Sequence, residues 1–119
     1  MSSYIAPKRL PAIASAAIVG NRFVDGAGIT NNNMTVKQSV VTSTPLGVAV
    51  ESVASGAEIE VTYTGGALME AGDAVGAGSP ITSDANGKAI VAAAASRFKR
   101  GVALTAAAAD GDIIEVLIF

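Results

Sequence analysis

Gly47-Val48-Ala49-Val50-Glu51, near the middle of the chain, returns near its end as Gly101-Val102-Ala103-Leu104-Thr105. Small residues follow each copy, and then comes a second match, Glu58-Ile59-Glu60-Val61 in the first copy and Ile113-Ile114-Glu115-Val116 in the second. Two copies are too few for a solenoid, which needs about three or more units to bury a continuous core. We therefore expect a single pseudo-symmetric domain made of two similar halves.

Another match lies upstream of each copy. Val24-Asp25-Gly26-Ala27-Gly28-Ile29-Thr30 is similar to Val75-Gly76-Ala77-Gly78-Ser79-Pro80-Ile81-Thr82. Neither glycine-rich element continues into a P-loop or a dinucleotide fingerprint, so we expect a tight turn that the symmetry repeats. On this alignment the half-repeats cover residues 16–65 and 66–119.

The repeat also predicts which side chains are buried. Residues at equivalent positions of two superposable halves should share the same environment. The predicted buried pairs are Val48 with Val102, Val50 with Leu104, Ile59 with Ile114, and Val61 with Val116.

Composition is that of one small folded domain. The chain has 119 residues, within the usual domain size of about 100–150. Its charged fraction of 15% is low and its hydrophobic fraction of 50% is high, while aromatic residues make up only 4%. We expect a thin core of valine, isoleucine and leucine with alanine as filler.

Several classes of function are disfavoured. The chain contains no cysteine and no histidine, so it lacks a thiol nucleophile and the commonest general base. A net charge of −2 argues against nonspecific binding to nucleic acid, which needs clustered lysine and arginine. No stretch approaches the roughly 20 apolar residues of a membrane span. We expect no catalytic residues, no metal site, no cofactor and no enzymatic activity.

The spacing of turn-forming residues along the chain predicts an all-β fold, a small β-barrel or β-sandwich. Short apolar runs alternate with Gly, Asn, Asp and Ser, as in domains built from short strands. Residues 1–15, with Pro7 and Pro11, lack strand alternation, and we expect an extended N-terminal arm followed by a single β domain over residues 16–119. The expected strands are 18–24, 35–41, 46–50, 59–64, 89–92, 102–104 and 113–118.

Two acidic loops resemble parts of a calcium loop, but neither has the downstream Glu of an EF-hand. Asp84-Ala85-Asn86-Gly87 ends in a strong hairpin-turn signal, and Asp110-Gly111-Asp112 precedes the last expected strand. Both are predicted to be turns. The basic cluster Arg97-Phe98-Lys99-Arg100 is either a solvated strand edge or a docking patch for an acidic partner.

One alternative function is a carrier domain. Residues 70–81 look like the half-motif of lipoyl and biotinyl carrier domains, which are also pseudo-symmetric all-β folds. Lys88 is the only candidate for the modified lysine, but Asn86-Gly87 occupies the hairpin tip and no Met-Lys-Met signature surrounds Lys88.

A stronger resemblance rests on Glu70-Ala71-Gly72-Asp73, on residues 80–88, on Gly101-Val102-Ala103-Leu104 and on residues 106–112. Together they resemble the small head decoration, or capsid cement, proteins of tailed bacteriophages. The resemblance implies a compact β domain that binds the outer surface of the capsid and stabilises the head. It also implies the phage major capsid protein as partner and a homotrimer at local threefold positions.

The N-terminal segment is the expected capsid contact. Pro7 restricts Ala6 to extended conformations, which lowers the entropy lost on docking, and an extended arm can add a strand to an open sheet edge. Two apolar side chains would be buried, and two cations would meet an acidic capsid surface. The expected contact residues are Tyr4, Ile5, Pro7, Lys8, Arg9 and Leu10.

Overall fold

The structure, a computed structural model, describes residues 6–41, 43–93, 96 and 99–119. In this part of the chain the expected all-β fold is confirmed, and none of it forms a helix long and apolar enough to cross a membrane. The strands are β1 (Lys8–Ala14), β2 (Phe23–Thr30), β3 (Asn33–Gln38), β4 (Gly47–Ala49), β5 (Glu58–Glu70), β6 (Pro80–Ser83), β7 (Ala89–Val91), β8 (Gly101–Ala103) and β9 (Ile113–Ile118).

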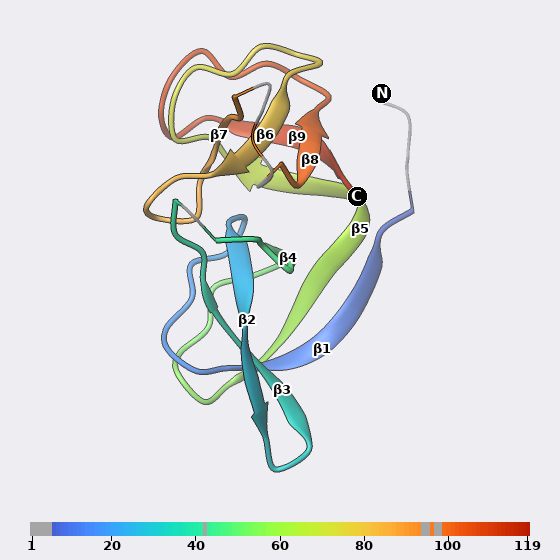
Figure 1. Cartoon of the computed structure of the whole chain (residues 1–119), viewed down its shortest axis with the longest axis vertical. Helices are drawn as coiled ribbons and strands as arrows, with labels where there is room; N and C mark the ends of the chain where they lie inside the picture. Colours follow the sequence, from blue (N-terminus) through green and yellow to red (C-terminus); the bar gives the residue numbers. More distant parts are fainter. Residues whose placement is uncertain (1–5, 42, 94–95, 97–98) are drawn as a thin grey trace.

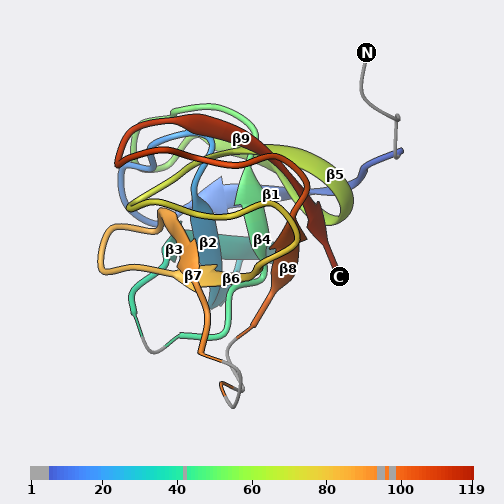
Figure 2. The same cartoon turned by 90° about the horizontal axis from the view of Figure 1, so that it is seen from above.

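The strands form two similar units that share β5 (Figure 1). In the first unit the order is β1-β3-β2-β4-β5, and β5 pairs back onto β1, so the ring closes into a barrel. The second unit runs β5-β9-β8-β6-β7, and a parallel bridge between Ala71 and Ala89 closes it. The first part of β5 belongs to the first ring and the last part to the second, and seen from above the second unit lies in front of the first (Figure 2).

Backbone hydrogen bonds show that the two units are built alike. Asn21 and Gly78 both have positive φ, 61° and 85°. Each donates its N–H to the alanine of the repeated Gly-Val-Ala element, over 2.8 Å to Ala49 and 2.7 Å to Ala103. The predicted pseudo-symmetry of two halves is therefore present in the fold.

The upstream alignment was wrong. Val24 pairs with Gly47 as Ile81 pairs with Gly101, so Val24 corresponds to Ile81 and not to Val75. The first glycine-rich element, residues 26–28, lies within β2 at a β-bulge, whereas residues 76–78 form a turn before β6. The two elements are similar in composition but do not occupy equivalent positions, so they do not form a repeated turn. The first unit begins at β1 and the second begins within β5, rather than at residues 16 and 66.

Each unit has its own hydrophobic cluster, and the two correspond nearly position by position. The first unit buries Ala12, Ala14, Ile18, Val24, Val36, Ala49, Ile59 and Val61. The second buries Met69, Ala71, Val75, Ile81, Ala89, Ala103, Ala107, Ile114, Val116 and Ile118. Phe23 and Val48 of the first unit join the second cluster, and these two side chains hold the units together.

The predicted core was only partly right. The four residues predicted from β5 and β9 are buried, as is Val48, and Val102 is partly buried. Val50 and Leu104, however, are 37% and 41% exposed. Because β4 and β8 end one residue earlier, at buried alanines, strand alternation turns these two side chains outward.

The expected arm is also corrected, since residues 8–14 form β1. This strand pairs antiparallel with β5 and, at Ile13 and Ala14, parallel with β3. Burial of Ala12 and Ala14 makes it an integral barrel strand. The prolines misled the prediction: Pro7 precedes the strand, and Pro11 is exposed in β1.

Other strand limits moved as well. Residues 65 and 66, expected to end a strand, lie inside β5, where Gly65 adopts a φ of 93° and the strand passes from one unit to the other. Neither β6 nor the outer part of β2 was expected. The strand predicted over residues 113–118 is confirmed as β9.

Candidate functional site

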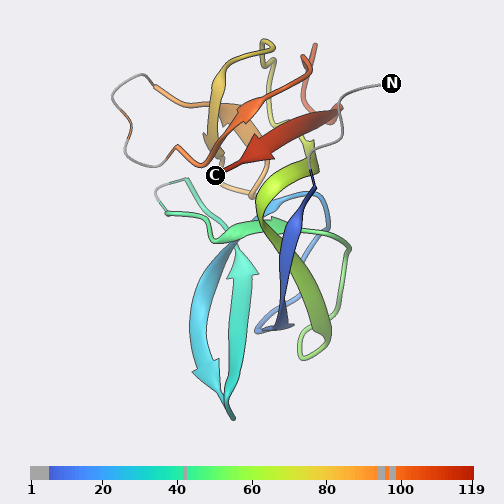
Figure 3. The same ribbon diagram turned by 90° about the vertical axis from the view of Figure 1, so that its right-hand side faces the viewer.

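The expected contact residues that the structure describes lie just before and at the start of β1, beside the point where β5 crosses between the units (Figure 3). Tyr4 and Ile5 are outside the described residues. Lys8 pairs with Thr64 and Arg9 with Thr62, with a register shift between them. Both cations are exposed, whereas Leu10 is partly buried and packs against the core of the first unit.

Gly65 explains how the chain before β1 is held in place. A Cβ at this position would collide with the carbonyl oxygen of Ala6 and lie 2.8 Å from the Cα of Pro7. Only glycine allows this approach, and its φ of 93° is in the region that other residues rarely adopt. The backbone of residues 6 and 7 therefore packs directly on the bend of β5.

Arg9 lines a surface depression of about 130 Å³ at the junction of the two units. Val50 and Leu68 are the exposed apolar residues in it, at 37% and 53%. The remaining lining comes from Asn21, Val48, Ala49, Thr62, Gly66 and Ala67. An apolar hollow with a cation in its lining suits an apolar partner side chain next to a carboxylate. The sequence analysis missed Val50 and Leu68, because Val50 was predicted to be buried and Leu68 lay outside every expected strand.

The structure describes two residues of the second basic cluster, Lys99 and Arg100. Arg97 and Phe98 are outside the described residues. Arg100 turns inward: its Nε donates to the carbonyl of Pro45 over 2.8 Å, and its Nη2 donates to the carbonyls of Leu46 and Tyr63 over 2.9 and 3.0 Å. Burial lowers the pKa of Arg100 from its ordinary value. This side chain joins the units and is not presented to a partner.

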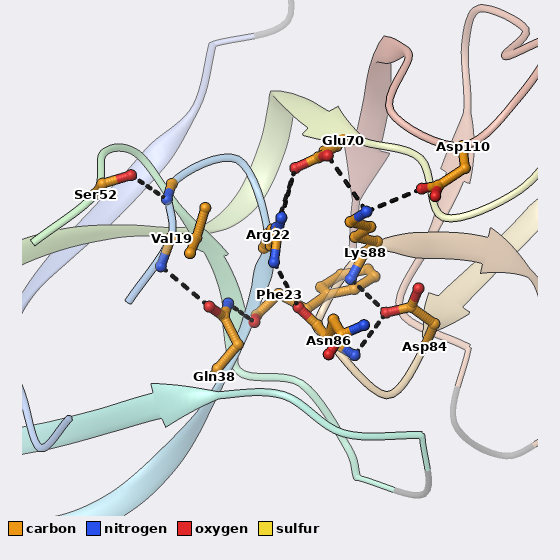
Figure 4. Close-up of polar contacts among 11 residues, drawn as sticks. Val19, Arg22, Phe23, Gln38, Ser52, Glu70, Asp84, Asn86, Lys88 and Asp110 are labelled. Atoms are coloured by element: carbon orange, nitrogen blue, oxygen red, sulfur yellow. Dashed lines mark hydrogen bonds and ion pairs between the residues drawn. The ribbon is translucent and has the colours of Figure 1, made fainter. Parts of the chain in front are cut away.

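Lys88 lies in an ion-pair network at the junction (Figure 4). Its Nζ is 2.9 Å from Asp110 Oδ1 and 3.5 Å from Glu70 Oε2, and Glu70 also pairs with Arg22 over 3.0 Å. The hydrogen bond that Lys88 donates to Asp110, together with the charges of both carboxylates, raises the pKa of Lys88 above its ordinary value. A charged lysine held by two carboxylates, with a side chain only 17% exposed, is unlike the displayed lysine of a carrier domain.

The two acidic loops are turns, as predicted. Asp84 Oδ1 accepts hydrogen bonds from the backbone N–H groups of Asn86 and Lys88, each over 2.8 Å. Asp112 Oδ2 accepts from those of Ala108 and Ala109 over 2.8 and 3.2 Å. Among the residues that the structure describes, no three potential ligand side chains gather where they could hold a metal ion.

Comparison with known proteins identifies the family. A sequence model of the phage cement protein family matches residues 10–118. Among solved structures, the chain is similar to the N base of the head fiber gp8.5 of bacteriophage phi29, with 18% sequence identity and a TM-score of 0.77 over 97% of this chain and 94% of that one. No curated protein matches the sequence. The chain belongs to the phage cement protein family, and it is a structural protein that binds the outer surface of the phage head.

Proposed function

We propose that the chain attaches to the major capsid protein through its N-terminal segment and the adjoining depression, and that this attachment stabilises the head. The observation that carries the proposal is the position of Arg9, exposed at the start of β1 and in the lining of the apolar hollow that contains Val50 and Leu68. The guanidinium of Arg9 and the apolar side chains of Val50 and Leu68 therefore form one continuous surface that a partner can contact.

The chemistry of the segment supports this role. Lys8 and Arg9 meet an acidic capsid surface, which contributes orientation and association rate more than affinity. Tyr4 and Ile5 supply apolar surface, worth about 1.5–3 kcal/mol for each side chain that is fully buried. The backbone of residues 6 and 7 is held against the bend of β5, because it packs on Gly65. Leu10 supports the contact from below through its packing in the core.

A homotrimer is part of the proposal. Leu104 and Ile113 are exposed apolar residues at β9 and beside it, and a chain with 4% aromatic residues gains stability from further apolar burial. The backbone N–H of Leu104 donates to the carbonyl of Glu115, which holds Leu104 beside the strand that begins at Ile113. Closed cyclic assemblies are the usual outcome of such self-association.

The proposed role is structural and requires no catalytic group. Head stabilisation follows if the chain binds the assembled lattice more tightly than separate capsid subunits, because a ligand shifts an equilibrium only through its differential affinity for the two states. A protein that contacts two neighbouring subunits has this property.

The test is decoration of purified capsids that lack the protein, measured by co-sedimentation. Arg9→Glu should weaken binding by about tenfold at low salt, mainly through slower association. Deletion of residues 2–5, which leaves every described strand intact, should also weaken it. Lys99→Glu is the matched charge reversal in the other basic cluster. If Lys99→Glu weakens decoration and Arg9→Glu does not, the N-terminal segment is not the anchor.

A further inference from the structure

The two units differ in the length of one hairpin, and the register of the repeat shows which residues are added. The rung Gly26–Val36 in the β2–β3 hairpin corresponds to the rung Ser83–Ala89 in the β6–β7 hairpin. Beyond it, the second unit closes at once through the loop of residues 84–88. The first unit adds further rungs and ends in a turn at Asn31 and Asn32, whose φ angles are 52° and 65°. The barrel therefore closes without this extension, residues 27–34.

The extension is exposed and uncharged. Ile29 is 78% exposed, the largest fraction among the exposed large hydrophobic residues, and the chain carries no charge between Asp25 and Lys37. The hairpin projects from the body of the first unit, away from the start of β1 (Figures 1 and 3). A single exposed apolar side chain is common on protein surfaces, so what distinguishes Ile29 is its surroundings, the open strand edges and the depression beside the hairpin.

Both edges of the extension are open in the described part of the chain. β4 pairs with β2 only at Phe23 and Val24, and β1 pairs with β3 only at Thr35 and Val36. Proteins usually protect open edges with charged residues, proline or a covering segment. Residues 27–34 carry no charge, and no neighbouring strand in the described part of the chain covers their edges, so another chain can pair there.

A second depression, of about 210 Å³, lies where the hairpin meets the barrel. Its lining is mixed: Pro11, Ile13 and Met34 supply apolar side chains, while Asn33 and the exposed carboxylate of Glu58 supply polar groups. This hollow suits an apolar side chain next to a cation, the opposite charge preference to that of the hollow lined by Arg9.

We infer that the extension and its depression form a second capsid-binding surface, which accepts a capsid-protein segment that presents an apolar side chain beside a lysine or arginine. The inference rests on the proposed function, because it takes the capsid as the partner already assigned to the family. Since the tip of the β2–β3 hairpin projects away from the start of β1 (Figures 1 and 3), one chain can hold two neighbouring capsid subunits, and binding to both subunits is what stabilises the head.

The experiment uses full-length protein and purified capsids that lack it. Ile29→Ser should weaken decoration by about tenfold, because the variant no longer buries an isoleucine side chain against the capsid. The melting temperature should stay unchanged. Glu58→Lys should weaken it as well. Val91→Ser is the matched control, an exposed β-branched residue on the equivalent hairpin of the second unit, and it should bind as wild type does. In a further variant, residues 27–34 are replaced by Asp-Ala-Asn-Gly, the sequence of residues 84–87 in the short loop of the second unit.

The outcomes separate this inference from the proposed function. If Ile29→Ser and the shortened hairpin decorate capsids as wild type does while the N-terminal deletion does not, the second surface is refuted and the first one stands. Equal losses with Ile29→Ser and Val91→Ser would also refute it, because the effect would not be specific. If Ile29→Ser changes the sedimentation of the free protein and not its capsid affinity, the hairpin binds a second copy of the chain, contrary to the inference.

Discussion

Gly47 and Gly101 occupy equivalent positions, each facing a backbone carbonyl of the strand beside it. A Cβ on Gly47 would collide with the carbonyl oxygen of Thr62, and one on Gly101 with that of Leu117. The residues that follow them pair with these same partners, Val48 with Thr62 and Val102 with Leu117. The glycine that opens each repeated element is thus required by close strand packing.

Gly47→Ala and Gly101→Ala should each destabilise the fold, since strand backbone would have to move to relieve the collision. We expect a loss of about 1–3 kcal/mol in the free energy of unfolding, typical of overpacking. Urea unfolding measures it. Gly26→Ala is the control, because a Cβ there meets nothing within 4 Å. Equal stability of all three variants would contradict the requirement for glycine at Gly47 and Gly101.

Core truncation should distinguish the two faces of the repeat. Ile114 is 1% exposed, and Ile114→Ala should cost about 2–4 kcal/mol through loss of apolar contact and creation of a cavity. Val102 is only partly buried, because no third unit covers the face that Val48 buries in the first unit. Val102→Ala should therefore cost clearly less. Thermal or urea unfolding of both variants gives the comparison, and equal losses would mean that Val102 is core.

The network around Lys88 should stabilise the protein in a pH-dependent way. Its pKa is raised above the ordinary 10.5, so the stabilisation is complete below pH 10.5 and is lost as the pH rises through the folded-state value. The difference in urea midpoint between wild type and Lys88→Met should be constant from pH 8 to 10 and shrink above that. A difference that grows with pH would contradict the sign.

Arg100 should matter for stability and not for attachment. Arg100→Ala removes the donor from the carbonyls of Pro45, Leu46 and Tyr63, and leaving such groups without a partner costs about 1–3 kcal/mol where they are buried. Arg100→Lys should recover only part of this, because one ammonium cannot reproduce the guanidinium geometry. Calorimetry and capsid co-sedimentation separate the effects. Lost decoration with unchanged melting temperature would reassign Arg100 to the contact surface.

The repeat was visible in the sequence where it is fixed by tight packing. Gly-Val-Ala recurs because the glycine must clear a carbonyl and the alanine must fit inside a small barrel, so both copies were found and aligned correctly. The outward residues after them are not constrained in this way. That is why Val50 and Leu104 looked like core residues and are exposed.

The upstream alignment failed because the true equivalence is between unlike residues. Asn21 corresponds to Gly78, since both adopt positive φ and bond to the same alanine carbonyl. Asparagine and glycine both tolerate positive φ, but a comparison of residue identities does not detect this shared property. The similar glycine-rich stretches nearby offered a better match by composition and a wrong one by position.

β1 was missed because prolines outweighed a weak alternation. Leu10, Ala12 and Ala14 face the core while Pro11 and Ile13 face outward. This period of two is the usual mark of a half-buried strand, and small side chains made it faint. The hollow lined by Arg9 could not be predicted, because it joins residues from β1, β4 and β5 through pairings that no local pattern specifies.

The central claim, attachment at the outer surface of the head, is tested most directly by an electron cryomicroscopy reconstruction of the virion. We predict barrel-shaped density outside the shell, at local threefold positions, with the start of β1 and the hollow lined by Arg9 against the major capsid protein. Absence of the chain from the outer surface, or density in which the capsid touches neither β1 nor the β2–β3 hairpin, would contradict the account.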